Sequence, residues 1–96
     1  MLRLLVALIV SLAFLSLSAY AKEVYSTDDT KIGVLLADPE AKAVLEKHIP
    51  QNVEDKRFTM AKAFTLRFIA EYDEKGELTD ENLDKIDHDF AELSKQ

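Results

Sequence analysis

The strongest local signal in this chain is a helix start at residues 38–40, followed ten residues later by a helix stop. Asp38 is a favoured N-cap, Pro39 is favoured at the first helical position, and Glu40 suits the positive end of the helix dipole. Apolar side chains and one histidine then recur at positions 41, 44, 45, 48 and 49, which gives one face at helical spacing. Because Pro50 cannot continue a helix, the pattern predicts an amphipathic helix from Pro39 to about His48.

Similar signals divide the rest of the chain into short pieces. Residues 30–37 place Ile32, Leu35 and Leu36 at helical spacing and predict a short helix, although this apolar run is also compatible with a strand. Residues 73–78 predict a turn, with Gly76 in the left-handed conformation. Thr79 is then the expected cap of a last helix, whose apolar positions 83, 86, 90 and 93 form a narrow seam.

The middle of the chain leaves two interpretations open. Asn52 is a candidate cap, with Asp55 three residues later, and residues 53–72 are compatible with one helix throughout. Alternatively, Thr65 caps a second helix, and the two helices meet near Ala63. A wide apolar stripe predicts that this segment is central and largely buried. The stripe consists of Phe58, Met60, Ala61, Phe64, Phe68, Ile69 and Tyr72.

These elements predict an all-α fold, a small antiparallel bundle of four to five short helices within residues 31–94. Residues 22–30 are expected to form a flexible N-terminal segment. Without cysteine, the fold has no disulfide, and a chain of about 75 residues is near the lower size limit for a core without staples.

Residues 1–21 resemble a secretory signal peptide. Arg3 supplies the positive start, residues 4–17 are almost entirely apolar, and Ala19-Tyr20-Ala21 offers a small-residue cleavage site. The alternative is an uncleaved anchor, but residues 4–21 form a stretch of only 18 residues, at the short end for spanning about 30 Å of hydrocarbon. We therefore expect export to the periplasm or the medium, with no stable membrane association after cleavage.

Several stretches resemble a known type of domain. They are the run from Thr30 to Pro50, then residues 60–66, residues 78–80 and residues 83–87. Together they are similar to a small helical domain that occurs alone or at the ends of secreted bacterial hydrolases of the esterase and glycosidase kind. The resemblance spans roughly residues 25–93 and implies a secreted accessory module. It transfers no catalytic residue, because the matching positions are caps, turns and core residues.

The charge is unevenly distributed. The whole chain has a net charge of −6, but residues 71–92 hold ten acidic side chains and two lysines, a net charge of −8. This balance argues against a nucleic-acid partner, because phosphate contacts require clustered Lys and Arg. Acidic faces commonly serve only for solvation, and the alternative is a docking surface for a basic partner. The candidate docking residues are Asp73, Glu74, Glu77, Asp80, Asp84 and Asp87.

Metal sites and catalysis find little support in the sequence. When Gly76 is aligned with position 6 of an EF-hand loop, Lys75 and Asn82 fall at positions that require ligand oxygens. Asp84 and His88 lie four residues apart and could share one helix face, but two ligands are too few for a tight metal site. Cofactor-binding and metal sites are therefore not expected.

We also expect no catalytic site. His48 is expected to interact with the end of its helix, and the serines outside the leader, Ser26 and Ser94, lie in no nucleophile motif. The sequence thus predicts a monomeric, non-enzymatic module that contacts another protein. The alternative is a carrier of apolar ligands or lipids, with a cavity lined by Phe58, Met60, Phe64, Phe68 and Ile69.

Overall fold

The computed structural model describes residues 24–96, so the predicted signal peptide lies outside the described residues. Within them the fold is all-α, as predicted, and its six helices are joined by short connections. They are α2 (Ile32–Ala37), α3 (Pro39–His48), α4 (Pro50–Glu54), α5 (Lys56–Met60), α6 (Leu66–Ala70) and α7 (Asp80–Leu93). No helix in this part of the chain is long and apolar enough to cross a bilayer.

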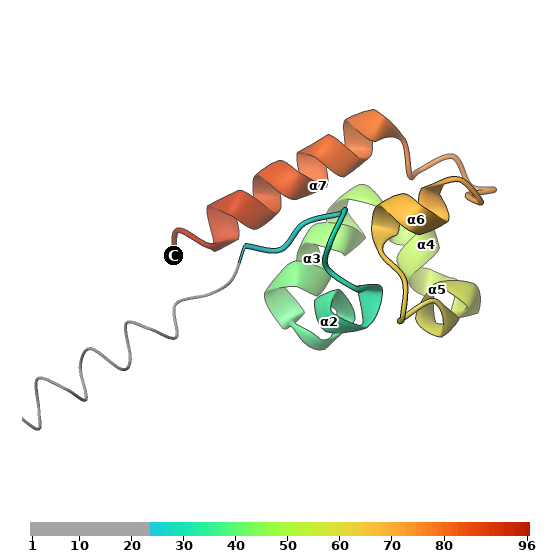
Figure 1. Ribbon diagram of the computed structural model, residues 1–96, viewed down its shortest axis with the longest axis horizontal. Coiled ribbons are helices and arrows are strands. Elements are labelled where there is room, and N and C mark those ends of the chain that lie inside the picture. Colours follow the sequence, from blue (N-terminus) through green and yellow to red (C-terminus); the bar gives the residue numbers. More distant parts are fainter. Residues whose placement is uncertain (1–23) are drawn as a thin grey trace, which may run out of the picture.

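The longest helix, α7, lies across the group of shorter ones (Figure 1). It packs against α3, and the two run antiparallel: His48 lies near Glu81, whereas Glu40 lies near Leu93. The core between the helices collects the buried apolar side chains, namely Ile32, Leu35, Ala41, Val44, Leu45, Ile49, Phe58, Leu66, Leu78, Leu83, Ile86 and Phe90. These include positions 41, 44, 45 and 49 of the face predicted for α3 and positions 83, 86 and 90 of the face predicted for α7. His48 and Leu93, the remaining members of the two faces, are only partly buried.

The predicted caps of α3 and α7 are confirmed. Asp38 accepts a hydrogen bond from the Glu40 N–H at 2.9 Å, and Thr79 accepts one from the Asn82 N–H at 3.1 Å. Gly76 has a φ of 76°, the left-handed value expected for the turn before α7.

The short helix at residues 32–37 is also confirmed, and its glycine has a structural reason. A Cβ atom on Gly33 would lie 3.1 Å from the Cβ of Lys62, so glycine permits a close approach of α2 to the chain after α5. There the N–H groups of Ile32 and Gly33 donate to the carbonyls of Phe64 and Lys62 at 2.9 and 3.1 Å.

The single-helix interpretation of residues 53–72 is wrong. Pro50 begins α4 directly after α3, and Asn52 lies buried within α4 instead of capping it. Asp55 caps α5, accepting from the Arg57 N–H at 2.8 Å, and Thr65 caps α6, accepting from the Phe68 N–H at 3.2 Å. The alternative of a break near residue 63 is therefore correct, but the chain also breaks at Asp55, which neither interpretation included.

This break also overturns the predicted burial of the stripe. Interrupting the helix between α5 and α6 changes the direction in which the later side chains point, so positions in phase with Phe58 no longer face the core. Phe58 is buried, but Phe64, Phe68 and Tyr72 are 45%, 52% and 71% exposed.

Candidate functional site

Three of the six predicted docking carboxylates are partly buried and hydrogen-bond to other parts of the fold. Asp73 accepts the N–H groups of Lys75 and Leu78 at 3.0 and 2.8 Å and so closes the turn before α7. Burial acts to raise the pKa of Asp73, but the N–H donors of Leu78 and Lys75 outweigh it and lower the pKa. Glu77 joins this turn to α4, since it accepts the Asn52 N–H at 2.9 Å and the Asn52 side-chain amide at 2.8 Å.

Asp87 fixes the N-terminal segment to α7. Its two carboxylate oxygens accept the backbone N–H and the hydroxyl of Thr27, at 2.7 and 2.8 Å, and Thr27 is fully buried. Arg67 joins this cluster from α6 with a hydrogen bond of 2.9 Å to the Thr27 hydroxyl and one of 3.2 Å to Asp87. A hydrogen bond from Arg67 to Asp84 raises the pKa of the guanidinium further.

The other three carboxylates point towards solvent. The side chains of Glu74, Asp80 and Asp84 are 75%, 97% and 74% exposed. Each lies within 4 Å of an arginine, Glu74 with Arg57 and both aspartates with Arg67. Exposed ion pairs of this kind contribute little to folding, so these carboxylates stay accessible to a partner.

The loop aligned with an EF-hand is held by its own hydrogen bonds. Asn82, at the last loop position, donates its side-chain amide to the Glu77 carbonyl at 2.8 Å. Lys75 reaches Asp55, the N-cap of α5, at 3.1 Å. In a calcium loop the residues at these two positions, 12 and 5, would instead direct oxygens at the ion. Among the described residues, no three histidine, aspartate or glutamate side chains gather in a way that suits a metal ion.

The histidines and serines within residues 24–96 have partners inside the fold. His48 Nε2 lies 2.7 Å from an oxygen of Asp89 and so links α3 to α7; the hydrogen bond from His48 lowers the pKa of Asp89. The ring of His88 lies 4.0 Å from Glu92, and not against Asp84 as a metal pair would require. Ser26 accepts two backbone N–H groups in its turn, and Ser94 donates to the Ala91 carbonyl.

An exposed aromatic surface is the feature that the sequence interpretation missed. It consists of Phe64, Phe68 and Tyr72, and Met60 at the end of α5 is also exposed, by 82%. The rings of Phe64 and Phe68 stack with centroids 4.9 Å apart, and Phe68 and Tyr72 lie 6.1 Å apart. The signal that could have revealed it is Thr65: once Thr65 is taken as a cap, these side chains no longer belong to one continuous helix face.

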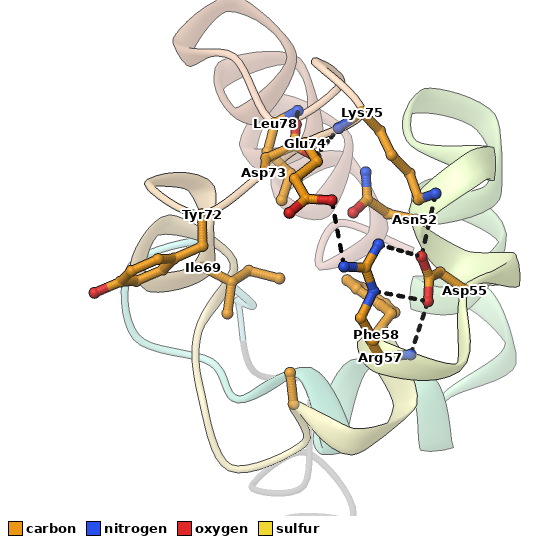
Figure 2. Close-up of a pocket in the computed structure, with 11 residues that line it drawn as sticks. Asn52, Asp55, Arg57, Phe58, Ile69, Tyr72, Asp73, Glu74, Lys75 and Leu78 are labelled. Carbon is orange, nitrogen blue, oxygen red and sulfur yellow. Dashed lines mark hydrogen bonds and ion pairs between the residues drawn. The ribbon is translucent and has the colours of Figure 1, made fainter.

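A cleft of about 310 Å³ lies between α5, α6 and the turn before α7 (Figure 2). Phe58, Ala61, Ile69 and Leu78 supply its apolar lining. Figure 2 shows Ile69 pointing into this space, whereas the ring of Tyr72 turns outward. Since Tyr72 belongs to both, the cleft and the aromatic surface are continuous.

Charged side chains close the opposite side of the cleft. Arg57 contacts Asp55 at 3.1 Å and reaches across to Glu74 at 3.4 Å. The Arg57 guanidinium, helped by Lys75, holds the pKa of Asp55 far below its ordinary value. The cleft thus combines an apolar lining with a charged rim, an arrangement typical of sites that bind by shape and charge.

Comparison of the chain with protein-family models, with curated proteins and with solved structures found no match. The carrier hypothesis stays a prediction. Of its five lining residues, Phe58 and Ile69 lie at the cleft, whereas Met60, Phe64 and Phe68 are exposed on the surface.

Proposed function

We propose that this protein is a secreted or periplasmic, non-catalytic helical module that binds another protein. The observation that supports this proposal best is the aromatic surface beside the cleft. Within residues 24–96, the side chains of Met60, Phe64, Phe68 and Tyr72 lie exposed, whereas most other large apolar side chains are buried. Exposed aromatic and methionine side chains next to a pocket are typical of the centre of a protein interface.

The chemistry of the remaining surface supports a binding role over catalysis. A serine nucleophile would need a base within hydrogen-bond distance. Within residues 24–96, the hydroxyls of Ser26 and Ser94 bond to backbone groups of their own turns and to neither histidine. The resemblance to domains appended to secreted hydrolases makes such an enzyme a reasonable partner class.

Site-specific photocrosslinking in cells that export the protein tests this function. Tyr72→p-benzoylphenylalanine places the crosslinker on the aromatic surface, and His88→p-benzoylphenylalanine places it on α7 as a matched exposed control. We expect a discrete protein adduct from position 72 and none from position 88. No adduct from position 72, or the same adduct from both positions, would contradict the proposal, as would a hydrolytic activity that one substitution abolishes.

A further inference from the structure

Resting on the proposed protein-binding function, we infer what kind of partner segment the cleft receives. It is a segment that inserts one large apolar side chain between Phe58, Ile69 and Leu78 and carries a basic residue beside it. Three observations lead to this: the size and lining of the cleft, the charge around it, and the weak ion pair across it.

The size and lining select a single side chain. A volume of about 310 Å³ is at the lower end of the range for small-molecule pockets, roughly 300–1,000 Å³. Its deepest residues are the buried Phe58 and Leu78, with Ile69 at the side. Anchor side chains at protein interfaces fill pockets of this kind, and neighbouring exposed rings exclude water around them. The outward ring of Tyr72 and the adjacent Phe68 are placed for that second role.

The charge around the cleft selects a basic neighbour. Its lining holds three carboxylates, on Asp55, Asp73 and Glu74, and two cations, on Arg57 and Lys75. Asp55 is already paired with both cations, and Asp73 with backbone N–H groups. The carboxylate that stays most accessible is therefore that of Glu74.

The acidic surroundings extend beyond the lining. Glu71 and Glu77 flank the turn, so the seven ionisable groups around the cleft number five acids and two bases, a net charge of −3. Complementary charge attracts a partner and fixes its orientation more than it adds affinity.

The ion pair across the cleft can exchange partners. Arg57 and Glu74 are 3.4 Å apart, and their side chains are 66% and 75% exposed, so this contact is weak. A basic residue of the partner can take the place of Arg57 at Glu74 while Arg57 keeps its hydrogen bonds to Asp55. The insertion of the apolar side chain therefore leaves neither Asp55 nor Glu74 without a cation.

Nuclear magnetic resonance titration of the purified protein with capped tripeptides tests this inference. The panel is Lys-Phe-Lys, Glu-Phe-Glu, Gly-Phe-Gly and Lys-Ala-Lys, each up to about 5 mM, which detects binding free energies of roughly −3 kcal/mol. We expect Lys-Phe-Lys to shift the amide signals of Phe58, Ile69 and Leu78 most strongly. Gly-Phe-Gly should bind about two- to fivefold more weakly, and Glu-Phe-Glu more weakly still.

Three variants locate the contact. Glu74→Gln should weaken the binding of Lys-Phe-Lys about two- to fivefold, and Glu92→Gln, an exposed acid on α7, should leave it unchanged. Ala61→Leu should fill the cleft and abolish the shifts without removing any contact group. If that variant does not fold, Tyr72→Ala serves instead, with about threefold to tenfold weaker binding expected.

The outcomes separate this inference from the proposed function. Equal binding of Glu-Phe-Glu and Lys-Phe-Lys, equal binding of Lys-Ala-Lys, or no shift with any peptide would overturn the inferred partner chemistry. If the position-72 crosslink still forms, the module binds a protein of another chemistry. If neither peptides nor crosslinks are observed, both proposals fail.

Discussion

Asp87→Ala should destabilise the protein strongly. From its position in an acidic stretch alone, Asp87 would be taken for an ordinary surface charge. The substitution removes both acceptors of Thr27, at 2.7 and 2.8 Å, and leaves the N–H of a fully buried residue without its carboxylate. Hydrogen bonds to charged groups contribute roughly 1.5–3 kcal/mol each. The side chain of Asp87 is 32% exposed, so solvent reduces this sum, and we expect a loss of about 2–4 kcal/mol.

Urea unfolding followed by circular dichroism measures this loss. A domain of this size has a free energy of unfolding of roughly 4–10 kcal/mol. If this free energy falls by about 1 kcal/mol per molar urea, the midpoint of urea unfolding should fall by about 2 M or more. Asp84→Ala is the matched control, because Asp84 is 74% exposed and contacts Arg67 at 2.8 Å. It should cost less than about 1 kcal/mol. If both variants unfold at the same urea concentration, Asp87 does not fix the N-terminal segment, and the reasoning is refuted.

Three further substitutions or conditions test the fold. Phe90→Ala should lower the free energy of unfolding by roughly 3–5 kcal/mol, since the ring is buried and packs edge-on against Tyr25 with centroids 5.8 Å apart. A melting temperature almost equal to that of the unsubstituted protein would mean that α7 is peripheral. Asp38→Ala should cost about 1 kcal/mol through the lost cap of α3, and unchanged thermal unfolding would argue that the helix starts elsewhere. Acidification should reduce the urea midpoint below about pH 4, because the lowered pKa values of Asp73 and Asp89 favour the folded state only while both are ionised. A midpoint that stays constant from pH 5 to pH 2 would contradict this assignment.

The positions at which α3 and α7 begin could be predicted from the sequence because their signals are local. Asp38 with Pro39 defines the start of α3, and Thr79 defines the start of α7, each through a hydrogen bond that spans two or three residues. The apolar spacing of both helices then identifies the faces that pack together. No distant contact is needed to read these elements.

The break between α5 and α6 depends on distant contacts, and here the sequence left two interpretations open. The carbonyls of Lys62 and Phe64 accept N–H groups from α2, about thirty residues earlier in the chain, which stabilises a turn where a helix was equally plausible. Because of that turn, Phe64 and Phe68 reach the surface instead of the core. The aromatic surface is therefore a consequence of tertiary structure that helical periodicity alone could not show.

The acidic face shows the same limit. Asp87 and Thr27 are separated by 60 positions, and Glu77 and Asn52 by 25, so charge counting could not distinguish these internal partners from free surface carboxylates. Glu74 retains the exposure that the docking hypothesis needs, and it lies beside the cleft.

The central claim is that a partner protein binds at the cleft beside Tyr72. The most direct measurement is the yield of the photocrosslinked adduct from position 72 with and without Ala61→Leu, in variants that export and fold equally well. The account predicts a discrete adduct that disappears when the cleft is filled, while expression and melting temperature stay the same. An adduct of undiminished yield with Leu at position 61 would show that the partner does not use the cleft and would contradict the account.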